Sequence, residues 1–214
     1  MRLVIPRLYV ILDAGRIREP LQEIAGQLLG VGVRLLQYRA KNLPVREMLE
    51  AATILAKMAR IQRGTFFVND RPDAAWLSGA DGVHVGQDDL RVEQARAVIG
   101  QDRWVGVSTH NLEQFQTAAA SSVDYVAIGP IFATRSKTNP DPVVGTDLIR
   151  KVRPLTKKPI VAIGGIRLER AAEVLEAGAD SVAVIGDILE AADPARQARR
   201  FIQRLEAVKL TAHH

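Results

Sequence analysis

Short apolar runs alternate with longer amphipathic stretches along the whole chain. Eight of these runs are rich in β-branched or aromatic residues and are bounded by Gly, Asp, Asn or Pro, which is typical of strands. Each run is followed by a segment that is compatible with a helix, and this alternation predicts parallel βα units. We expect strands at residues 7–12, 33–39, 65–69, 82–86, 104–108, 125–129, 159–163 and 181–185.

The clearest helix is predicted over residues 45–62. Glycine-containing corners precede several of the strands, at residues 30–32, 79–82 and 177–180. Such a repeated corner between helix and strand favours a closed barrel. The face of the predicted helix is marked by apolar residues at helical spacing, namely Met48, Leu49, Ala52, Leu55, Ala56 and Ala59.

The pattern therefore predicts an α/β protein with one (β/α)8 TIM barrel over residues 1–214. An open doubly wound sheet is the alternative, but it usually has fewer strands and a glycine-rich turn after the first one. The segment Leu12-Asp13-Ala14-Gly15 matches that turn poorly. One long irregular stretch, residues 131–145, follows the sixth strand, and we expect it to be a binding loop.

Composition narrows the class of protein. The chain has 214 residues and no cysteine, which excludes disulfides, thiolate metal sites and a cysteine nucleophile. No apolar run approaches the roughly 20 residues that span a bilayer. The apolar start, residues 1–15, is interpreted as a first strand rather than a signal peptide, because no cleavage site of small residues follows it. We expect a cytoplasmic protein.

The net charge of +5 favours anionic ligands such as phosphates or nucleic acid. Aromatic residues make up only 5% of the chain, and no basic run is interleaved with them. A basic surface without any particular partner is an equal alternative to a nucleic-acid role, so charge alone decides nothing. The candidate site residues favour small phosphorylated molecules as partners, with no nucleic acid and no membrane. Self-association into a homo-oligomer is compatible with such a barrel.

The second predicted strand carries candidate anion-binding side chains. Residues at alternate positions share a face, so Val33, Leu35, Gln37 and Arg39 are expected to align. The two apolar side chains should fill the barrel, and the two polar ones should emerge at its top with Lys41 just beyond. Together these three polar groups can hold an anion through charge-assisted hydrogen bonds. A solvated strand end is the alternative interpretation.

The third and fourth strands are followed by carboxylates. Asn69 and Asp70 end one strand, and Asp88 and Asp89 follow the other. Oxygen ligands on a rigid frame suit Mg²⁺, which keeps waters or substrate phosphates as further ligands. Alternatively, Asp70 or Asp89 caps the next helix, because Asp is a favoured N-cap residue. The pair beside two cations favours a magnesium ion that bridges to a phosphate.

The fifth strand ends with hydroxyl groups and a histidine. Ser108 can donate to a phosphate oxygen, although Ser108, Thr109 or Asn111 can also cap the following helix. His110 is a candidate acid or base, but a lone histidine without a recognisable partner is more often structural.

The loop after the sixth strand offers hydroxyls at Thr134 and Ser136 and an ammonium at Lys137. Glycines then follow the seventh strand, at residues 164–165, and the eighth, where Ile185 precedes Gly186. Glycine turns in these two places are the usual phosphate site of a barrel, where backbone N–H groups at the start of a short helix receive the phosphate.

The motifs QYRAK, VND, HVGQDD, GVSTH, GPIFATRSK and VAIGGI, in this order and spacing, resemble those of thiamine-phosphate synthases. The resemblance covers nearly the whole chain. It implies an enzyme that couples hydroxymethylpyrimidine diphosphate to a thiazole phosphate, with Mg²⁺ as cofactor and with release of pyrophosphate.

Three positions depart from the usual family pattern: Ala40 replaces a common Glu, Ser136 a frequent Thr, and Gly186 a common Ser. Matching the motif positions to the family assigns residues to three ligands. The resemblance places the pyrimidine diphosphate on Gln37, Arg39, Lys41, Asn69, Ser108 and Lys137, the metal on Asp70 and Asp89, and the thiazole phosphate on Thr134, Ser136, Gly165, Ile185 and Gly186.

Two rival functions remain for such a barrel. The first is a thiazole tautomerase-like isomerase, in which His110 would be the acid or base. The second is a non-catalytic regulatory barrel that binds phosphorylated ligands. An isomerase that handles no diphosphate has no need for Asp70, Asp89, Arg39 and Lys41 together, and a regulatory barrel has no need to keep the metal carboxylates.

Overall fold

The computed structural model describes residues 3–134 and 141–208, and within them eight parallel strands close into a barrel. Each strand pairs with its neighbours in sequence, and β1 pairs with β8 to close the ring. The predicted fold class and all eight predicted strands are confirmed. The strands are β1 (Leu8–Asp13), β2 (Leu35–Arg39), β3 (Thr65–Asn69), β4 (Gly82–Val85), β5 (Trp104–Thr109), β6 (Tyr125–Ile128), β7 (Ile160–Ile163) and β8 (Ser181–Val184).

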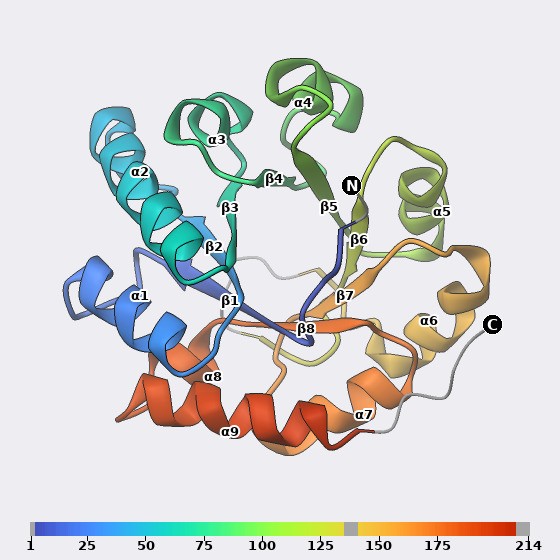
Figure 1. Cartoon of the computed structure of the whole chain (residues 1–214). Helices are drawn as coiled ribbons and strands as arrows, with labels where there is room; N and C mark the ends of the chain where they lie inside the picture. Colours follow the sequence, from blue (N-terminus) through green and yellow to red (C-terminus); the bar gives the residue numbers. More distant parts are fainter. Residues whose placement is uncertain (1–2, 135–140, 209–214) are drawn as a thin grey trace.

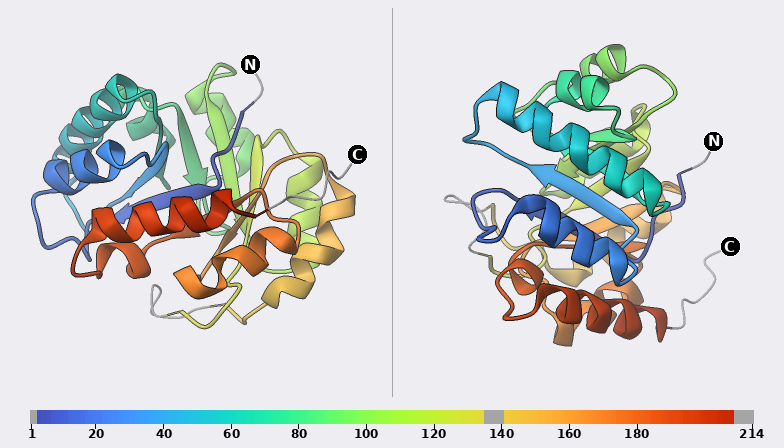
Figure 2. Two further views of the ribbon diagram at one scale, coloured as in Figure 1. Left: turned by 60° about the horizontal axis from the view of Figure 1, so that its bottom comes forward. Right: turned by 60° about the vertical axis from the view of Figure 1, so that its left-hand side comes forward.

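Helices surround this barrel as an outer ring (Figure 1). The last long helix lies beside the first, so the ring closes where the barrel closes (Figure 2). Within the described ranges, no helix is both long and apolar enough to cross a membrane. The helices are α1 (Leu21–Gly30), α2 (Val45–Ile61), α3 (Pro72–Ser78), α4 (Val92–Ile99), α5 (Leu112–Ala120), α6 (Gly145–Val152), α7 (Ala171–Glu176), α8 (Gly186–Leu189) and α9 (Pro194–Glu206), with two short 3₁₀ helices, η1 (Arg153–Leu155) and η2 (Leu168–Arg170).

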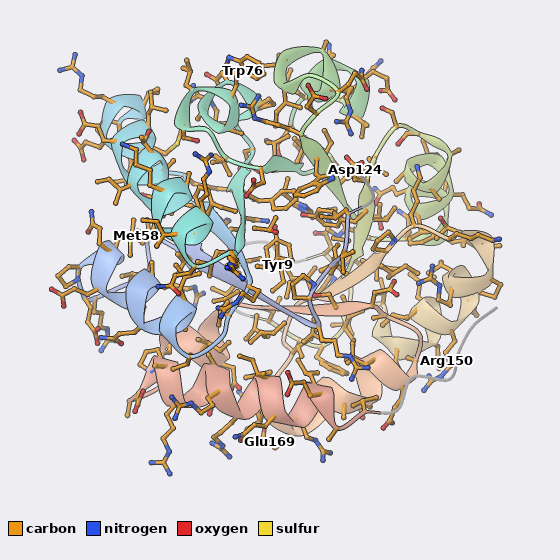
Figure 3. The ribbon with its side chains drawn as sticks, viewed as in Figure 1. Tyr9, Met58, Trp76, Asp124, Arg150 and Glu169 are labelled. Atoms are coloured by element: carbon orange, nitrogen blue, oxygen red, sulfur yellow. The ribbon has the colours of Figure 1, made fainter. Side chains whose placement is uncertain are left out.

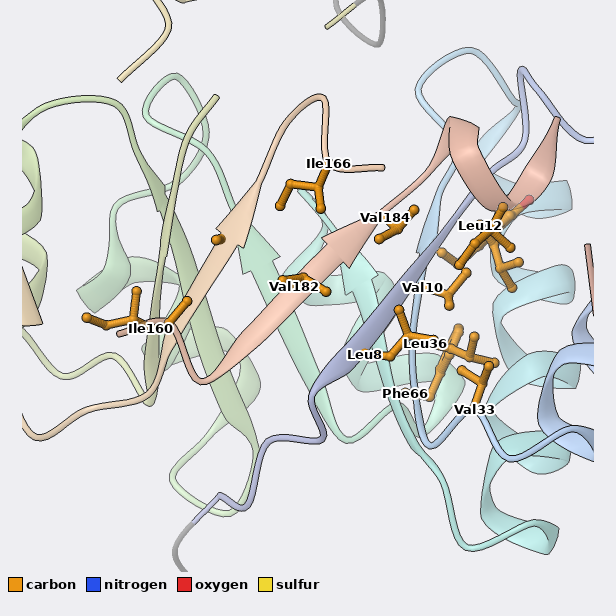
Figure 4. Close-up of a cluster of buried hydrophobic side chains, with 14 of the residues drawn as sticks. Leu8, Val10, Leu12, Val33, Leu36, Phe66, Ile160, Ile166, Val182 and Val184 are labelled. Carbon is orange, nitrogen blue, oxygen red and sulfur yellow. The ribbon is translucent and has the colours of Figure 1, made fainter. Parts of the chain in front are cut away.

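Alternation along the strands divides the buried side chains into two layers. On β1, Val10 and Leu12 point outward and pack against the helices (Figure 4), whereas Tyr9 and Ile11 point into the barrel. Both faces of β1 are buried, which is why its sequence is a nearly continuous apolar run. Figure 3 shows Tyr9 near the barrel centre.

The second predicted strand begins later than expected. We expected Val33 to share the inner face of β2 with Leu35, but only Leu35 belongs to the interior layer. Val33 precedes β2, donates its backbone N–H to Leu28 O at 3.1 Å and packs in the outer layer. The reason is Gly32, whose φ of 104° turns the chain out of α1 and places Val33 outside the strand's alternation.

Glycine makes room for large rings inside the barrel. A Cβ on Gly106 of β5 would lie 2.0 Å from the Tyr125 ring, and one on Gly82 of β4 would lie 2.3 Å from the Phe67 ring. These two rings meet edge to face at 5.5 Å between centroids. The rings of Phe67 and Tyr125 therefore occupy space that a side chain at position 82 or 106 would fill.

Candidate active site

The carboxyl ends of the strands open into a cavity of about 1130 Å³. A smaller cavity of about 210 Å³ adjoins it, and Asn69 lines both. Of the residues predicted from sequence, Lys41 and Asp70 line the smaller cavity. The larger one is lined by Gln37, Arg39, Asn69, Ser108, Thr134, Gly165, Ile185 and Gly186.

A chain of hydrogen bonds crosses the floor of the larger cavity. Gln37 Nε2 donates to the Tyr9 hydroxyl at 2.8 Å, and that hydroxyl lies 3.2 Å from the Tyr125 hydroxyl. The Tyr125 hydroxyl lies 2.7 Å from His84 Nδ1, and His84 Nε2 lies 2.8 Å from Ser108 Oγ. Five strands thus contribute one polar group each to a continuous network.

Burial keeps the two phenols of this network protonated. It raises the pKa of Tyr125 well above its ordinary value, and it raises that of Tyr9 as well. Each neutral phenol can donate one hydrogen bond and accept another. The network therefore sets the orientation of Gln37 at one end and of Ser108 at the other.

Both cations predicted on β2 and just after it have carboxylate partners. Arg39 Nη1 lies 2.6 Å from Asp13 Oδ2 at the end of β1, and Asp13 Oδ1 also accepts from the Gly15 backbone N–H at 3.1 Å. Lys41 Nζ lies 3.5 Å from Asp70 Oδ2. The first pair is largely buried and fixes the Arg39 guanidinium at the cavity wall, whereas Lys41 is half exposed.

The two carboxylates predicted to hold metal lie together. Burial, followed by the hydrogen bond and negative charge of Asp89, raises the pKa of Asp70 to about 6, while Lys41 acts in the opposite direction. Asp70 also has a φ of 64°, a left-handed conformation that is uncommon outside glycine. Facing carboxylates of this kind need a proton or a cation between them.

Neither aspartate caps a helix, so that alternative is wrong for both residues. The N-cap of α3 is Arg71 and that of α4 is Arg91. Asp89 Oδ2 instead accepts from the backbone N–H of Gly86 at 2.7 Å, which holds it within the turn after β4. In the described part of the chain, no cluster of three or more His, Cys, Asp or Glu side chains could hold a metal ion. An ion at this pair would therefore draw its other ligands from substrate or water.

The end of β5 divides its roles among neighbouring residues. Asn111 caps α5, since its side chain accepts from Gln114 N at 2.9 Å. Thr109 donates to Ala127 O at 2.8 Å and is buried, so neither it nor Ser108 is the cap. His110 places Nδ1 2.6 Å from Gly129 O and Nε2 3.5 Å from Asp141 Oδ2. His110 therefore has partners that the sequence did not reveal.

The turns after β7 and β8 form the opposite wall of the cavity. Gly164 and Gly165 have φ values of 97° and 65°, and a Cβ on Gly165 would lie 2.4 Å from Ala133 O. Only glycine fits this close approach of two loops. Gly186 begins α8 in the second turn, and Thr134 lines the same cavity. Ser136 and Lys137 lie outside the described residues.

Comparison with known proteins identifies the family. The family model for thiamine monophosphate synthase matches residues 8–188. A thiamine-phosphate synthase of Koribacter versatilis is 53% identical over 210 residues, which cover 96% of this chain and 98% of that protein. The chain belongs to the thiamine monophosphate synthase family. A thiamine-phosphate synthase of Chloroflexus aurantiacus is 43% identical and covers 91% of this chain and 90% of its own.

Solved structures agree with this membership of the thiamine monophosphate synthase family. Thiamine phosphate pyrophosphorylase from Pyrococcus furiosus superposes with a TM-score of 0.86 at 35% identity, covering 94% of this chain and 96% of its own. A 3-hexulose-6-phosphate synthase from Salmonella typhimurium gives a TM-score of 0.72 at 17% identity, covering 95% of this chain and 100% of its own. That second likeness shows a shared barrel fold alone.

Sequence reasoning missed four polar residues of this synthase-family site. Tyr9, Tyr125 and His84 form the middle of the floor network, and Asp13 orients Arg39. One signal was present for His84, because it alternates with Gly82 on a strand whose other side chains are apolar. The tyrosines carried no such signal, since an aromatic residue in a strand ordinarily indicates core packing.

Proposed function

We propose that this protein is a thiamine-phosphate synthase, which joins hydroxymethylpyrimidine diphosphate to thiazole phosphate and releases pyrophosphate. The observation that carries the proposal is the Asp70–Asp89 carboxylate pair with Lys41 beside it. These carboxylates follow β3 and β4, which lie across the closed barrel from β7 and β8 and their glycine turns. Family membership over nearly the whole chain supports the proposal. We further propose one domain over residues 1–214, acting in the cytoplasm and compatible with a homo-oligomer.

The pyrimidine diphosphate is assigned to the side of the barrel formed by β2 to β5. Arg39 and Lys41 supply positive charge, and the Gln37 amide and Ser108 hydroxyl lie at the two ends of the floor network. Asn69 lines both cavities, so it can contact a ligand that extends from one into the other. Lys137, outside the described residues, is assigned here by its motif.

Asp70 and Asp89 fit a magnesium ion by the chemistry of their donor set. A divalent cation would stabilise the charged form of Asp70, whose pKa is raised by burial and by the neighbouring Asp89 carboxylate. Mg²⁺ prefers oxygen ligands with open positions for phosphate. When bound there, the ion would neutralise charge on the departing diphosphate. Arg39 is held by Asp13 and Lys41 by Asp70, and both cations are placed to neutralise that charge as well.

The thiazole phosphate is assigned to the opposite wall. Gly165, Ile185 and Gly186 offer backbone groups there, and Thr134 offers a hydroxyl on the same cavity. Ser136 is assigned to this phosphate by its motif. The cavity volume of about 1130 Å³ is in the range that accommodates two small substrates.

The reaction requires the methylene–oxygen bond of the pyrimidine diphosphate to break, with its electron pair leaving on pyrophosphate. The thiazole nitrogen then forms the new C–N bond to that carbon. Stabilisation of the departing anion by preorganised charges lowers the barrier, and no protein nucleophile is needed. The protein's own task is to hold both anionic substrates in one cavity and to orient them.

The isomerase alternative rests on His110, which has partners in Gly129 O and Asp141. Nothing in that reaction uses the carboxylate pair or Arg39. The test is pyrophosphate release from purified protein with Mg²⁺ and pyrimidine diphosphate, with and without thiazole phosphate. Release that depends on thiazole phosphate and yields thiamine phosphate supports the proposal. Absence of release from folded protein contradicts it, and turnover of the thiazole precursor by isomerisation would then favour the alternative.

A further inference from the structure

Three arginines stand on the cavity wall formed by the β7 and β8 turns and α9. Arg167 follows β7, and Arg196 and Arg200 lie one helical turn apart on α9. All three are exposed residues that line the large cavity together with Gly165 and Gly186. None of the motifs discussed above includes them.

One carboxylate fixes the backbone that carries these arginines. Asp187 Oδ2 accepts from the backbone N–H of Leu168 at 3.1 Å and from Gln197 Nε2 at 3.0 Å. Arg167 and Arg196 are the residues directly before Leu168 and Gln197. The loop after β7 and the first turn of α9 are therefore tied to the same atom, next to Gly186, and bring the two arginines to one side of the cavity.

The charges on this wall favour an anion only because of the arginines. Glu190 forms an ion pair with Arg16. Asp187 receives hydrogen bonds from uncharged groups, so its negative charge remains and would repel a bound phosphate. Neither Arg167 nor Arg196 forms an ion pair within residues 3–134 and 141–208, whereas Arg170 nearby is engaged by Glu173.

The glycine turns alone offer dipoles and no net charge to a phosphate dianion. We propose that Arg167 and Arg196 contact the phosphate monoester of the second substrate from the solvent side, and thereby complete the site that Gly165 and Gly186 begin. Guanidinium groups suit this role because they present paired donors to phosphate oxygens. Arg200, which donates to Gln197 Oε1 at 3.0 Å, adds positive charge one turn further out.

This inference rests on the proposed function for the identity of the ligand. Of the two proposed substrates, the pyrimidine diphosphate is the less suitable ligand for the cavity wall that carries the arginines. Arg39, Lys41 and Asp70 lie on or directly after β2 and β3, and in a closed ring of eight strands these stand across the barrel from β7. The arginines therefore line the large cavity from the side of β7 and β8, whereas Asp70 lines the smaller cavity on the side of β2 and β3. The glycine turns line the same cavity as the arginines, so a phosphate monoester bound at these turns lies on the arginine side of the barrel.

The test compares Arg167→Gln and Arg196→Gln with Arg199→Gln, which removes the same charge from α9 at an exposed position that does not line the cavity. We expect the KM for thiazole phosphate to rise about tenfold in each of the first two variants, with kcat and the KM for pyrimidine diphosphate within twofold of wild type. Arg199→Gln should leave all three constants unchanged. An unchanged thiazole-phosphate KM in both cavity variants, or an equal rise in Arg199→Gln, overturns the inference.

Calorimetric titration with inorganic phosphate separates this inference from the proposed function. If the wild-type protein shows no coupling reaction, the proposed function fails, yet phosphate should still bind more weakly to Arg196→Gln than to Arg199→Gln. If coupling occurs and phosphate affinity is equal in these two variants, the arginine contact is wrong and the function stands. Circular dichroism and Tm measured on each variant verify that the proteins compared are folded.

Discussion

Asp13 holds Arg39 at 2.6 Å across the junction of β1 and β2, and both side chains are largely buried. Their strands pair in parallel with these two residues directly opposite each other. The carboxylate therefore both neutralises the guanidinium and fixes its direction. In the proposed reaction Arg39 meets a diphosphate, and the ion pair with Asp13 would orient its guanidinium before the substrate arrives.

Replacing Asp13 with Asn should weaken this arrangement. We expect Asp13→Asn to lower kcat/KM for pyrimidine diphosphate by about tenfold, which corresponds to about 1.4 kcal/mol. Steady-state kinetics with varied pyrimidine diphosphate measure it. Asp147→Asn is the matched control, because Asp147 pairs with Arg150 on the exposed face of α6. Equal kinetics in the two variants would show that Arg39 needs no partner to be oriented.

Asp70→Asn should raise the stability of the metal-free protein at pH 8 and lower its activity with Mg²⁺. The pKa of Asp70 in the folded protein is about 6, above its ordinary value of 3.8. The contribution of Asp70 to the free energy of unfolding is therefore fully present below pH 3.8 and is lost as the pH rises through about 6. Asn removes the ionisable group and tolerates the left-handed backbone at this position. In metal-free protein at pH 8, we expect the variant to unfold about 2–4 °C above wild type, for a gain of about 1 kcal/mol.

That gain should shrink at pH 4, where wild-type Asp70 is protonated in the folded state. Turnover of Asp70→Asn with Mg²⁺ should fall by at least about a hundredfold, since one of the two assigned metal ligands is lost. Thermal unfolding at both pH values and a pyrophosphate assay measure these effects. A variant with normal turnover would remove Asp70 from the metal site, and a Tm below wild type at pH 8 would contradict the charge argument.

Tyr125→Phe should interrupt the floor network at its centre. The change leaves Tyr9 without one hydroxyl neighbour and His84 Nδ1 without its partner in a buried site. We expect a loss of about 1–3 kcal/mol in the free energy of unfolding. Tyr38→Phe is the control for chemical denaturation, because the Tyr38 hydroxyl makes no hydrogen bond with any of the described residues and its ring is likewise buried. Similar losses in both variants would mean that the network adds nothing to stability.

Gly106→Ala should destabilise the barrel far more than Gly30→Ala. A Cβ at position 106 would lie 2.0 Å from the Tyr125 ring, so strand or ring must move at a cost of about 3 kcal/mol. Position 30 has no atom within 4 Å of such a Cβ, and Ala favours the end of α1. Denaturant midpoints of the two variants give the comparison. A midpoint for Gly106→Ala near that of wild type would show that the interior is loosely packed.

The fold could be predicted because its signals are local. The helix over 45–62 is marked by its own spacing, and the structure has Val45–Ile61. The error at Val33 arose because alternation was assumed to start at Val33, directly after the turn at Gly32, where backbone conformation rather than residue type decides the face. The local pattern therefore located the helices and strands, but it placed the start of β2 two residues too early.

The site could be predicted only in part. Residues at strand ends, such as Arg39 and Asp70, were found because all parallel strands present their carboxyl ends to one side. The floor network was missed because Tyr9 and Tyr125 are 116 residues apart, and His84 and Tyr125 are 41 apart. Barrel closure and strand register bring these three side chains together, and neither can be deduced from a single segment.

The segment before β1 affects how ligands reach the cavity. Leu3 packs in the interior layer, which also contains the rings of Phe67 and Tyr125, and Ile5 lies against that layer. Among the described residues, this segment closes the amino end of the barrel, and the large cavity lies at the carboxyl ends of the strands. The two substrates and two products of the proposed reaction would share this cavity, so a product that is still bound there would hinder entry of the next substrate.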